Sequence, residues 1–342
     1  MANDWACLFL HCITPLHNGA GQGLGTIDRP ILRERTTNYP IVQADTLKGA
    51  LKATAESNGW DANTELAPTF GKGETGGNQG ALIFKEASLL AFPVRSLAGT
   101  FAWVTSRLIL ARLCRWLKEA GLEAQPLARH AQTLLDATTS LDNDAQRTLG
   151  PKRPADGDQA AFDDSTLRLG KNGTYVLEGL VLQAVNDVTQ RKALADFAAT
   201  LAELLFGRAD AVWAPFFRQR LLLLPHAPFD HLIQTATEVR PNIRIGEKGV
   251  TEEGSLRYTE FLPAETLLLS FVHLEEPMLC ATADKNGLWS KCAALMNRSF
   301  QLGADESKGK GIVQGHLWIA PAASGAGAST GASAQGVNHG SK

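Results

Sequence analysis

The chain has 342 residues with five cysteines, 44% of its residues are hydrophobic and 20% are charged, and its formal net charge is −2. These values are typical of one or two soluble globular domains with a sizeable core, and they exclude a protein that binds polyanions over its whole surface. The cysteines are widely spaced without a CxxC pair and no apolar run is long enough for a membrane span, so we expect a cytoplasmic protein without disulfides, structural zinc or a membrane partner.

The first part of the chain alternates between strand, loop and helix patterns. Apolar periodicity and capping residues predict four elements in order: a buried strand at 5–13, a helix that begins at Asp45 and ends at 58–59, a strand at 81–91, and a helix at 100–120. Residues 121–173 are rich in Asp, Thr, Ala, Gly and Pro. We expect an insertion there that is helical at first and then mobile.

The second part of the chain returns to regular elements. The patterns predict a strand at 175–185, a helix at 193–206, a strand at 220–224, a hairpin with arms at 238–245 and 256–261, a strand at 267–274, a helix at 288–297 and a strand at 312–319. Beyond residue 320 an Ala/Gly/Ser tail (321–342) lacks apolar residues to bury and is expected to be disordered. We therefore expect a single domain over 1–320.

This mixture of elements favours an α+β fold. The predicted hairpin and the spacing of the strands do not fit a doubly wound parallel sheet, and a ferredoxin-like sheet with helices on one face fits better. No GxGxxG motif opens a helix and no GxxxxGK[ST] motif is present, so dinucleotide-binding and P-loop folds are weak alternatives.

The segment from His17 to Lys52 carries the most informative pattern. Four glycines at 19, 21, 23 and 25 precede the lone carboxylate Asp28, and residues 29–52 hold five Lys/Arg against two acids. Glycines let the backbone approach a bulky anion and the cations neutralise it, whereas an isolated carboxylate in such a place suggests a metal ligand or a proton carrier. The pattern indicates a phosphate-rich polymer bound beside a place where it is cut.

Four segments together resemble a known family: HNGAGQGLGTIDRPILRERTTNYPIVQADTLKGALK at 17–52, FPVRSLAGTFAWVTSRLILARL at 92–113, ATEVRPNIRIGEKGVTEEGSLRYTEFLPAETL at 236–267 and LGADESKGKGIV at 302–313. They are similar, in the expected order, to the RAMP superfamily of CRISPR proteins, and within it to the repeated backbone subunit of the type III-B (Cmr) effector complex. Ala44, Asp45 and Ala304 depart from the residues usual in the family, but Asp28 and Lys48 do not.

The resemblance implies a fold, partners and a reaction. The fold is a ferredoxin-like (RRM-like) palm with a protruding β-hairpin thumb, here at about 236–265. Copies stack head to tail along a CRISPR guide RNA, together with other Cmr-complex subunits, and the backbone subunit cleaves complementary target RNA at regular intervals with a divalent metal, Mg²⁺ or Mn²⁺. Asp28 matches the catalytic aspartate and is the expected metal ligand.

The chemistry of RNA makes a single carboxylate sufficient. RNA carries its own nucleophile, the 2′-OH, beside each phosphate, and cleavage requires that oxygen to lie in line with the leaving 5′-oxygen. A thumb that displaces a nucleotide would allow this geometry, and one Asp would help to hold Mg²⁺. The alternative is an Asp that only bonds its own backbone in a turn before Arg29-Pro30.

The expected RNA-binding residues fall in the same four segments: His17, Arg33, Arg35, Lys48, Lys52, Arg95, Arg240, Arg244, Gly309, Lys310 and Gly311. All of them except Arg95 have a simpler explanation. His17 would be a structural residue at a strand end, Arg33 and Arg35 would pair with Glu34, the lysines would be solvated, Arg240 and Arg244 would keep an edge strand soluble, and 309–311 would form a plain turn.

Two other functions remain open at this point. The first is an RNA-coating filament subunit that has no chemistry. The second is an endoribonuclease that processes guide RNA, which would need His17 near Asp28 as an acid–base residue.

Overall fold

The computed structural model describes residues 4–21, 23, 25–72, 79–150, 167–169, 173–207, 212–245, 250–275 and 285–320. Three predicted features lie outside these residues: the tail at 321–342, the second part of the insertion, and the turn of the long hairpin at 246–249. The structure does not test the predictions made for them.

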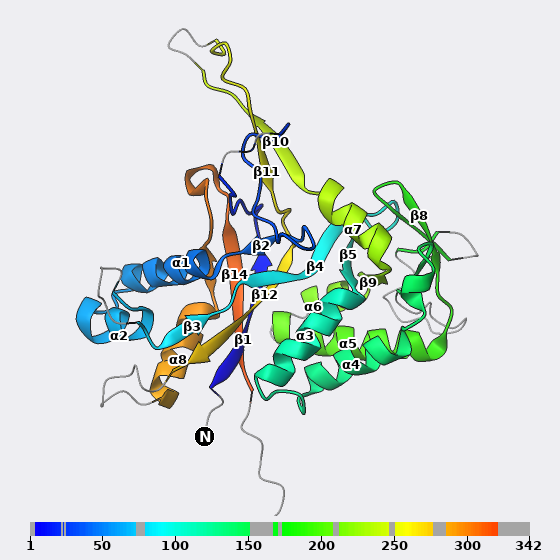
Figure 1. Cartoon of the computed structure of the whole chain (residues 1–342), viewed down its shortest axis with the longest axis horizontal. Coiled ribbons are helices and arrows are strands. Elements are labelled where there is room, and N and C mark those ends of the chain that lie inside the picture. The colour runs from blue at the N-terminus through cyan, green and yellow to red at the C-terminus, as the bar shows by residue number, and fades with distance from the viewer. Residues whose placement is uncertain are drawn as a thin grey trace, which may run out of the picture.

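A mixed sheet forms the centre of the molecule (Figure 1). Within the described ranges it has nine strands, and its main path runs β13-β14-β1-β12-β4-β5-β9, while β2 pairs with β4 and β3 with β12. The strands are β1 (Trp5–Cys12), β2 (Ile41–Val42), β3 (Leu82–Phe84), β4 (Ala87–Arg95), β5 (Phe101–Ser106), β9 (Leu221–Leu224), β12 (Leu267–Leu274), β13 (Ser299–Gln301) and β14 (Ile312–Ile319). With its flanking helices this sheet confirms the predicted α+β class.

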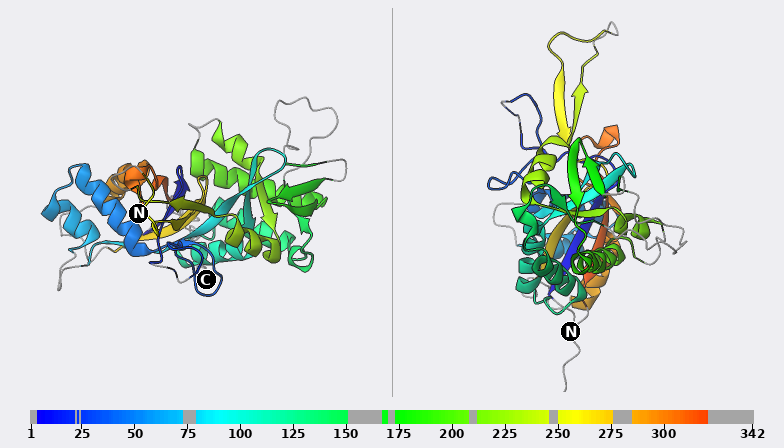
Figure 2. Two further views of the ribbon diagram at one scale, coloured as in Figure 1. Left: turned by 90° about the horizontal axis from the view of Figure 1, so that it is seen from above. Right: turned by 90° about the vertical axis from the view of Figure 1, so that its right-hand side faces the viewer.

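The central strands follow a β-α-β-β-α-β order. The successive elements are β1, α1 (Ala44–Ser57), β4, β12, α8 (Lys285–Met296) and β14. In space the strands lie in the order β14-β1-β12-β4, and every neighbouring pair is antiparallel. Helices α1 and α8 contact each other on one side of the sheet, and the larger helical group lies on the other (Figures 1 and 2).

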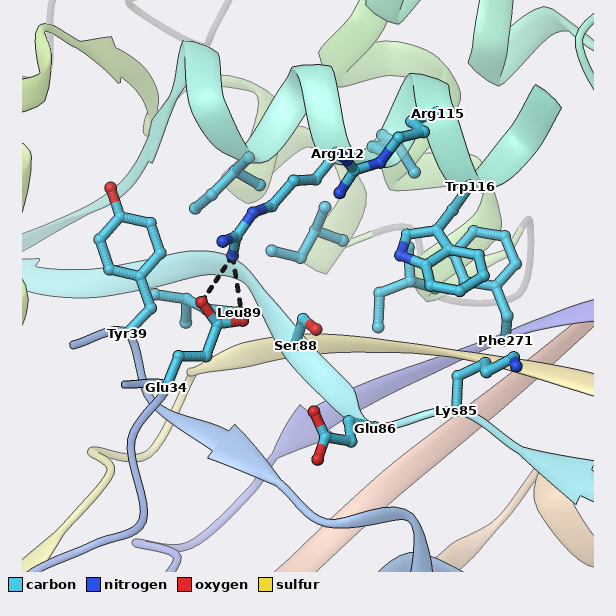
Figure 3. A pocket seen from close by; sticks show the side chains of 14 residues that line it. Glu34, Tyr39, Lys85, Glu86, Ser88, Leu89, Arg112, Arg115, Trp116 and Phe271 are labelled. Atoms are coloured by element: carbon cyan, nitrogen blue, oxygen red, sulfur yellow. Dashed lines mark hydrogen bonds and ion pairs between the residues drawn. The ribbon is translucent and has the colours of Figure 1, made fainter. Parts of the chain in front are cut away.

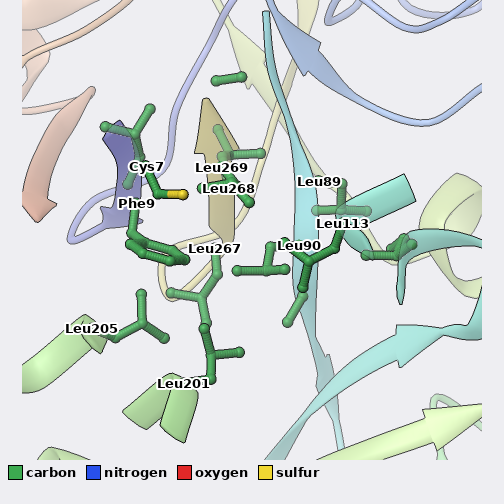
Figure 4. Close-up of a cluster of buried hydrophobic side chains, with 14 of the residues drawn as sticks. Cys7, Phe9, Leu89, Leu90, Leu113, Leu201, Leu205, Leu267, Leu268 and Leu269 are labelled. Atoms are coloured by element: carbon green, nitrogen blue, oxygen red, sulfur yellow. The ribbon is translucent and has the colours of Figure 1, made fainter. Parts of the chain in front are cut away.

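The larger helical group explains why β1 is apolar along its whole length. It contains α3 (Arg107–Glu119), α4 (Pro126–Ala137), α5 (Val188–Phe206), α6 (Trp213–Arg218) and α7 (His226–Thr235). Figure 4 shows Phe9 of β1 and Leu267 of β12 beside Leu201 and Leu205 of α5. Because both faces of β1 are covered, its side chains cannot alternate between apolar and polar. No described helix is long and apolar enough to cross a membrane.

The predicted helix at 100–120 was wrong over its first residues. Residues 101–106 (FAWVTS) form β5, which pairs antiparallel with β4 and parallel with β9, and α3 begins only at Arg107. The aromatic and β-branched residues suit a pleated sheet, and the Ser106 hydroxyl accepts a hydrogen bond from Ile109 N–H as the helix cap.

Three smaller predictions also need correction. The strand expected at 175–185 is a hairpin of β7 (Thr174–Leu177) and β8 (Leu180–Ala184), which forms a small sheet with β6 (Arg147–Thr148). The strand at 81–91 is two strands, β3 and β4. Helix α1 begins at Ala44 with Gln43 as its N-cap, so Asp45 lies inside the helix, and the short helices 62–66 and α2 (Ala67–Phe70) follow it.

The predicted long hairpin is present and projects from the body of the molecule (Figure 1; Figure 2, right). Strands β10 (Glu238–Asn242) and β11 (Arg257–Phe261) form a separate two-stranded antiparallel sheet. Farther out, Ile245 pairs with Thr251 in an isolated bridge. We call residues 238–261 the projecting hairpin.

Candidate nucleic-acid interface

The Asp28 segment lies against the base of the projecting hairpin, as the dark-blue loop beside β11 in Figures 1 and 2 shows. Arg29 N–H donates to the Tyr258 carbonyl oxygen at 3.0 Å, and Glu260 N–H donates to the Arg29 carbonyl oxygen at 3.0 Å. Arg29 thus pairs in parallel with Thr259 of β11. The Asp28 segment is therefore joined to the hairpin by an isolated β-bridge.

The Asp28 carboxylate is held by this pairing. Its Oδ2 atom accepts a hydrogen bond from Tyr258 N–H at 2.7 Å. This contact overturns the simpler interpretation in which the carboxylate bonds only its own turn. The side chain is partly exposed, and within the described ranges its Oδ1 atom has no hydrogen-bond partner.

Asp28 could hold a metal ion only with help from a bound phosphate. In the described part of the chain no group of three or more His, Cys, Asp or Glu residues could hold a metal ion. Mg²⁺ keeps most of its waters and binds through one or two carboxylates plus substrate phosphates. One free carboxylate oxygen at an open surface fits that chemistry, whereas it would not fit a structural metal site.

His17 is buried, with only 3% of its surface exposed. Its Nδ1 lies 2.7 Å from the Glu260 carbonyl oxygen, and its ring packs 5.6 Å from that of Phe261. Burial lowers the pKa of His17, and this outweighs the opposing effect of the Glu260 hydrogen bond. In the free subunit His17 braces the base of β11 and does not present its ring to solvent.

Arg33 belongs to a buried ion pair with Glu260, not with Glu34. Its Nη2 atom lies 2.6 Å from Glu260 Oε1. Glu34 instead pairs with Arg112 of α3 at 2.8 Å. Arg35 is exposed, and among the described residues it has no partner, so it remains available to a phosphate.

The two lysines of α1 lie on one face of the helix. Lys48 is half-buried, and burial together with the positive charge of Lys52 lowers its pKa although Asp45 opposes this. Lys52 donates to the Gly71 carbonyl oxygen at 3.3 Å. Arg95 is the last residue of β4, where it is exposed and pairs with Glu178 at 3.0 Å.

Arg240 and Arg244 are exposed on the projecting hairpin. Arg240 Nε donates to Glu238 at 2.9 Å, and Arg244 lies 3.7 Å from Glu252 with 77% of its side chain exposed. Both ion pairs are within the hairpin and open to solvent, where such pairs are weak. A phosphate could therefore replace either carboxylate.

The loop at 309–311 offers no free backbone donors, so its two glycines cannot bind RNA through their N–H groups in this conformation. Gly309 N–H donates to Glu306, Lys310 N–H to Asp305, and Gly311 N–H to Pro15, all to carbonyl oxygens. Gly311 packs so closely on the Leu302 carbonyl that a Cβ would collide with it. The Lys310 amino group lies 5.7 Å above the Phe261 ring and is the one cation of this tripeptide.

The structure thus brings one group of predicted residues together around the base of the hairpin: His17, Asp28, Arg33 and Lys310. Arg240 is also on this part of the hairpin, opposite Thr259, which pairs with Arg29. Lys48, Lys52, Arg95 and Arg244 lie elsewhere. Sequence reasoning missed Glu260, Tyr258 and the Arg29–Asp305 ion pair of 3.3 Å, which ties the Asp28 segment to the loop at 303–311. Glu260 lies in one of the segments that carry the family resemblance. The sequence signal that could have identified it is an acidic residue directly before the apolar residues FLP.

A pocket of about 320 Å³ lies between α3, β4 and β12 (Figure 3). Arg112 closes one side by binding Glu34, and Trp116 stacks on Phe271 at 5.7 Å on the other. None of the predicted site residues lines it, so it is separate from the Asp28 site.

Comparisons with known proteins agree with this architecture. The CRISPR system Cmr endoribonuclease Cmr4 of Pyrococcus furiosus is 29% identical over 309 residues, which cover 89% of this chain and 92% of that protein. The crystal structure of oligomeric Cmr4 from the same organism superposes with a TM-score of 0.65 at 22% identity, covering 93% of this chain and 98% of the other.

A subunit of the type III-B Cmr-beta complex bound to cognate target RNA, solved by cryo-EM, has a TM-score of 0.68 at 20% identity, with 92% and 96% of the two chains covered. At these identities the two solved structures establish a shared fold. The model of the RAMP superfamily matches residues 9–314, and the chain therefore belongs to the RAMP superfamily and is related to Cmr4.

Proposed function

We propose that this chain is a Cmr4-like backbone subunit of a type III-B effector complex, that it binds guide RNA, and that it cleaves the paired target RNA. The similarity to Cmr4 over most of both chains supports the first part. The cleavage proposal is carried by one observation: the Asp28 carboxylate is fixed to β11 through one oxygen, and the other oxygen is available at the base of the projecting hairpin.

We infer that the central sheet is the ferredoxin-like (RRM-like) palm and the projecting hairpin is the thumb. The β-α-β-β-α-β order of the central elements and their antiparallel pairing support this. Copies of the chain would stack head to tail along the guide with other Cmr-complex subunits. The crystal structure of oligomeric Cmr4 supports association between copies.

The reaction is a transesterification within the target RNA. The 2′-oxygen bonds to the adjacent phosphorus, the bond to the 5′-oxygen breaks, and the proton lost by the 2′-OH is balanced by the proton gained by the 5′-oxygen. The products are a 2′,3′-cyclic phosphate and a 5′-hydroxyl. A regular duplex keeps the 2′-oxygen out of line, so the hairpin must displace a nucleotide before the reaction can proceed.

Asp28 supplies the fixed negative charge at the scissile phosphate. Asp28 would help to hold Mg²⁺ or Mn²⁺, which when bound would supply positive charge against the charge that develops on the phosphate oxygens. The Tyr258 N–H bond orients the carboxylate, so the side chain does not have to be ordered at each turnover.

The remaining contacts serve binding. Arg35, Lys48, Lys310 and the hairpin arginines 240 and 244 present cations on several elements, and base pairing with the guide reads the sequence. Lys52, Arg95 and Arg33 have protein partners and contribute less. Burial of His17 disfavours the guide-processing alternative, since that reaction needs an accessible acid–base residue.

The proposal predicts that Asp28→Asn in the assembled complex lowers the single-turnover rate of target cleavage by at least 100-fold, while guide and target binding stay within twofold. Asn retains an oxygen for Tyr258 N–H but loses the negative charge. Asp196→Asn on α5 is the matched control, because it removes the same charge from an exposed pair with Lys192. A filament subunit without chemistry would show full target binding and no Mg²⁺-dependent cutting by the unmodified complex.

A further inference from the structure

Glu260 is a carboxylate in a place where carboxylates are rare. It lies on β11 two residues after Tyr258, and only 4% of its surface is exposed. A buried carboxylate is stable only when its oxygens are paired and hydrogen-bonded. The partners of Glu260 therefore show what this residue holds together.

The two carboxylate oxygens bind two different parts of the molecule. Oε2 accepts a hydrogen bond from Ile31 N–H at 3.0 Å, three residues after Asp28. Oε1 accepts from Arg33 Nη2 at 2.6 Å and from the Thr237 hydroxyl at 2.9 Å. Thr237 directly precedes β10, so one side chain joins the Asp28 segment to both strands of the hairpin.

Arg33 extends this connection to the helix before the hairpin. Its Nη1 atom donates to the Ile233 carbonyl oxygen in the last turn of α7 at 3.3 Å and to the Asn38 carbonyl oxygen at 3.0 Å. The guanidinium therefore bridges α7, which leads into the hairpin, and the turn that follows the Asp28 segment. The same guanidinium binds Glu260 through its Nη2 atom.

The contacts of Glu260 and Arg33 bear on the register in which the Asp28 segment pairs with β11. Asp28 and Arg29 contact β11 through only three backbone or carboxylate bonds, all to Tyr258 and Glu260. Without further restraint so short a pairing can slip, and a slip of one residue moves the chain by about 3.3 Å. A displacement of 1 Å in a catalytic group already costs about 100-fold in rate.

We propose that Glu260 and Arg33 are positioning residues that lock the register of the Asp28 segment on the hairpin and thereby decide which phosphodiester is cut. This inference rests on the cleavage proposed above. The hairpin selects the nucleotide that is displaced, and Asp28 selects the phosphate. Glu260 fixes the distance between the two, so cutting occurs at one bond in each interval.

The test is single-turnover cleavage by the assembled complex carrying Glu260→Gln, read at single-nucleotide resolution with Mg²⁺. The amide keeps the shape but cannot accept all three hydrogen bonds. We expect the cleavage rate to fall 10- to 100-fold and the cuts to spread from one phosphodiester to its neighbours in each interval, with target affinity within twofold of the unmodified complex.

Glu34→Gln is the matched control. It makes the same Glu-to-Gln change close to the Asp28 segment. It breaks the ion pair with Arg112, which lies on α3 and not on the hairpin. This variant should cut at the original bonds with a rate within twofold. A residue with only a structural role would reduce the yield of complex and leave the cut positions unchanged.

Thr237→Val keeps the proposal testable if Glu260→Gln does not assemble. It removes one hydrogen bond from the hairpin side and leaves the ion pair with Arg33 intact, and a several-fold slower rate with partial spreading is expected. Unchanged cut positions and rates in whichever of these variants assembles would overturn the inference. Failure of the unmodified complex to cut would instead overturn the proposed function.

Discussion

At the residue scale, contacts between distant parts of the chain decide what each charged side chain can do. The sequence singled out Asp28 because a lone acid among glycines and arginines is unusual. It could not assign His17 or Arg33, because both bind Glu260, which lies more than 220 residues farther along the chain. The simpler alternative, in which Arg33 and Arg35 pair with Glu34, was wrong, because Glu34 pairs with Arg112 of α3 and Arg33 with Glu260.

Stability should depend on pH through His316. Burial first, and the neighbouring His11 second, lower the pKa of His316 to about 4. The unfolded chain, with a histidine pKa of about 6.5, then binds the proton more readily than the folded chain. The free energy of unfolding should therefore be at its full value above pH 6.5 and fall as the pH drops toward 4.

The free energy of unfolding should fall less between pH 7.5 and pH 5 in His316→Gln than in the unmodified chain. The difference should be about 1 kcal/mol, after allowance for the partial exposure of the ring. Urea unfolding at the two pH values measures the difference. His231→Gln, at an exposed position of α7, serves as control. An equal fall in the free energy of unfolding for the His316 variant and the unmodified chain would show that His316 does not cause the pH dependence.

At the element scale, apolar strands were easy to predict from the sequence, but the point where a strand is followed directly by a helix was not. Strands β1 and β12 match their predictions closely, because each is a largely apolar run of eight residues. Strand β14 also matches, although its burial alternates along the strand. The boundary between β5 and α3 was missed because the apolar residues from 101 to 113 fit both a strand and a helix. Pairing of β5 with β9, more than 110 residues away, decides the outcome.

The turn between β7 and β8 gives an element-scale prediction. Glu178 and Gly179 both have positive φ, 46° and 94°, as a two-residue hairpin turn requires. No atom lies within 4 Å of a Cβ placed on Gly179, so Gly179→Ala should destabilise through backbone strain alone, by about 1–2 kcal/mol.

Chemical denaturation measures this cost directly. Val181→Ala is the local control, since that side chain is 59% exposed and its truncation should change the free energy of unfolding by less than about 0.5 kcal/mol. An unchanged midpoint for Gly179→Ala would show that the turn accepts a side chain and that its φ angle is not a constraint.

At the scale of the whole molecule, a net charge of −2 means that RNA must be bound by local groups of cations. The sequence predicted that these groups exist, and it also predicted the α+β class. It could not predict which cations remain free, because Arg33, Arg95 and Arg112 pair with acids from other elements. Among the described residues Arg35 and Lys48 form no ion pair, and the hairpin arginines 240 and 244 pair only with acids of the hairpin itself.

Lys48→Gln should therefore weaken guide-RNA binding by a constant factor for all guide sequences. One phosphate contact fewer should lower the slope of log Kd against log salt by about 0.7. Fluorescence anisotropy over a salt series measures both values. Lys118→Gln, an exposed lysine at the end of α3, should leave both unchanged, and a normal slope for the Lys48 variant would remove Lys48 from the RNA interface.

The central claim is that the Asp28 carboxylate, held against the hairpin, supports metal-dependent cutting of guide-paired RNA. The most direct measurement follows end-labelled complementary RNA with the assembled complex in Mg²⁺, in EDTA and after Mg²⁺ is restored. We predict a regular ladder of products with 2′,3′-cyclic phosphate ends that EDTA abolishes, Mg²⁺ restores and Asp28→Asn eliminates. A ladder of equal intensity from the Asp28→Asn complex would contradict this account.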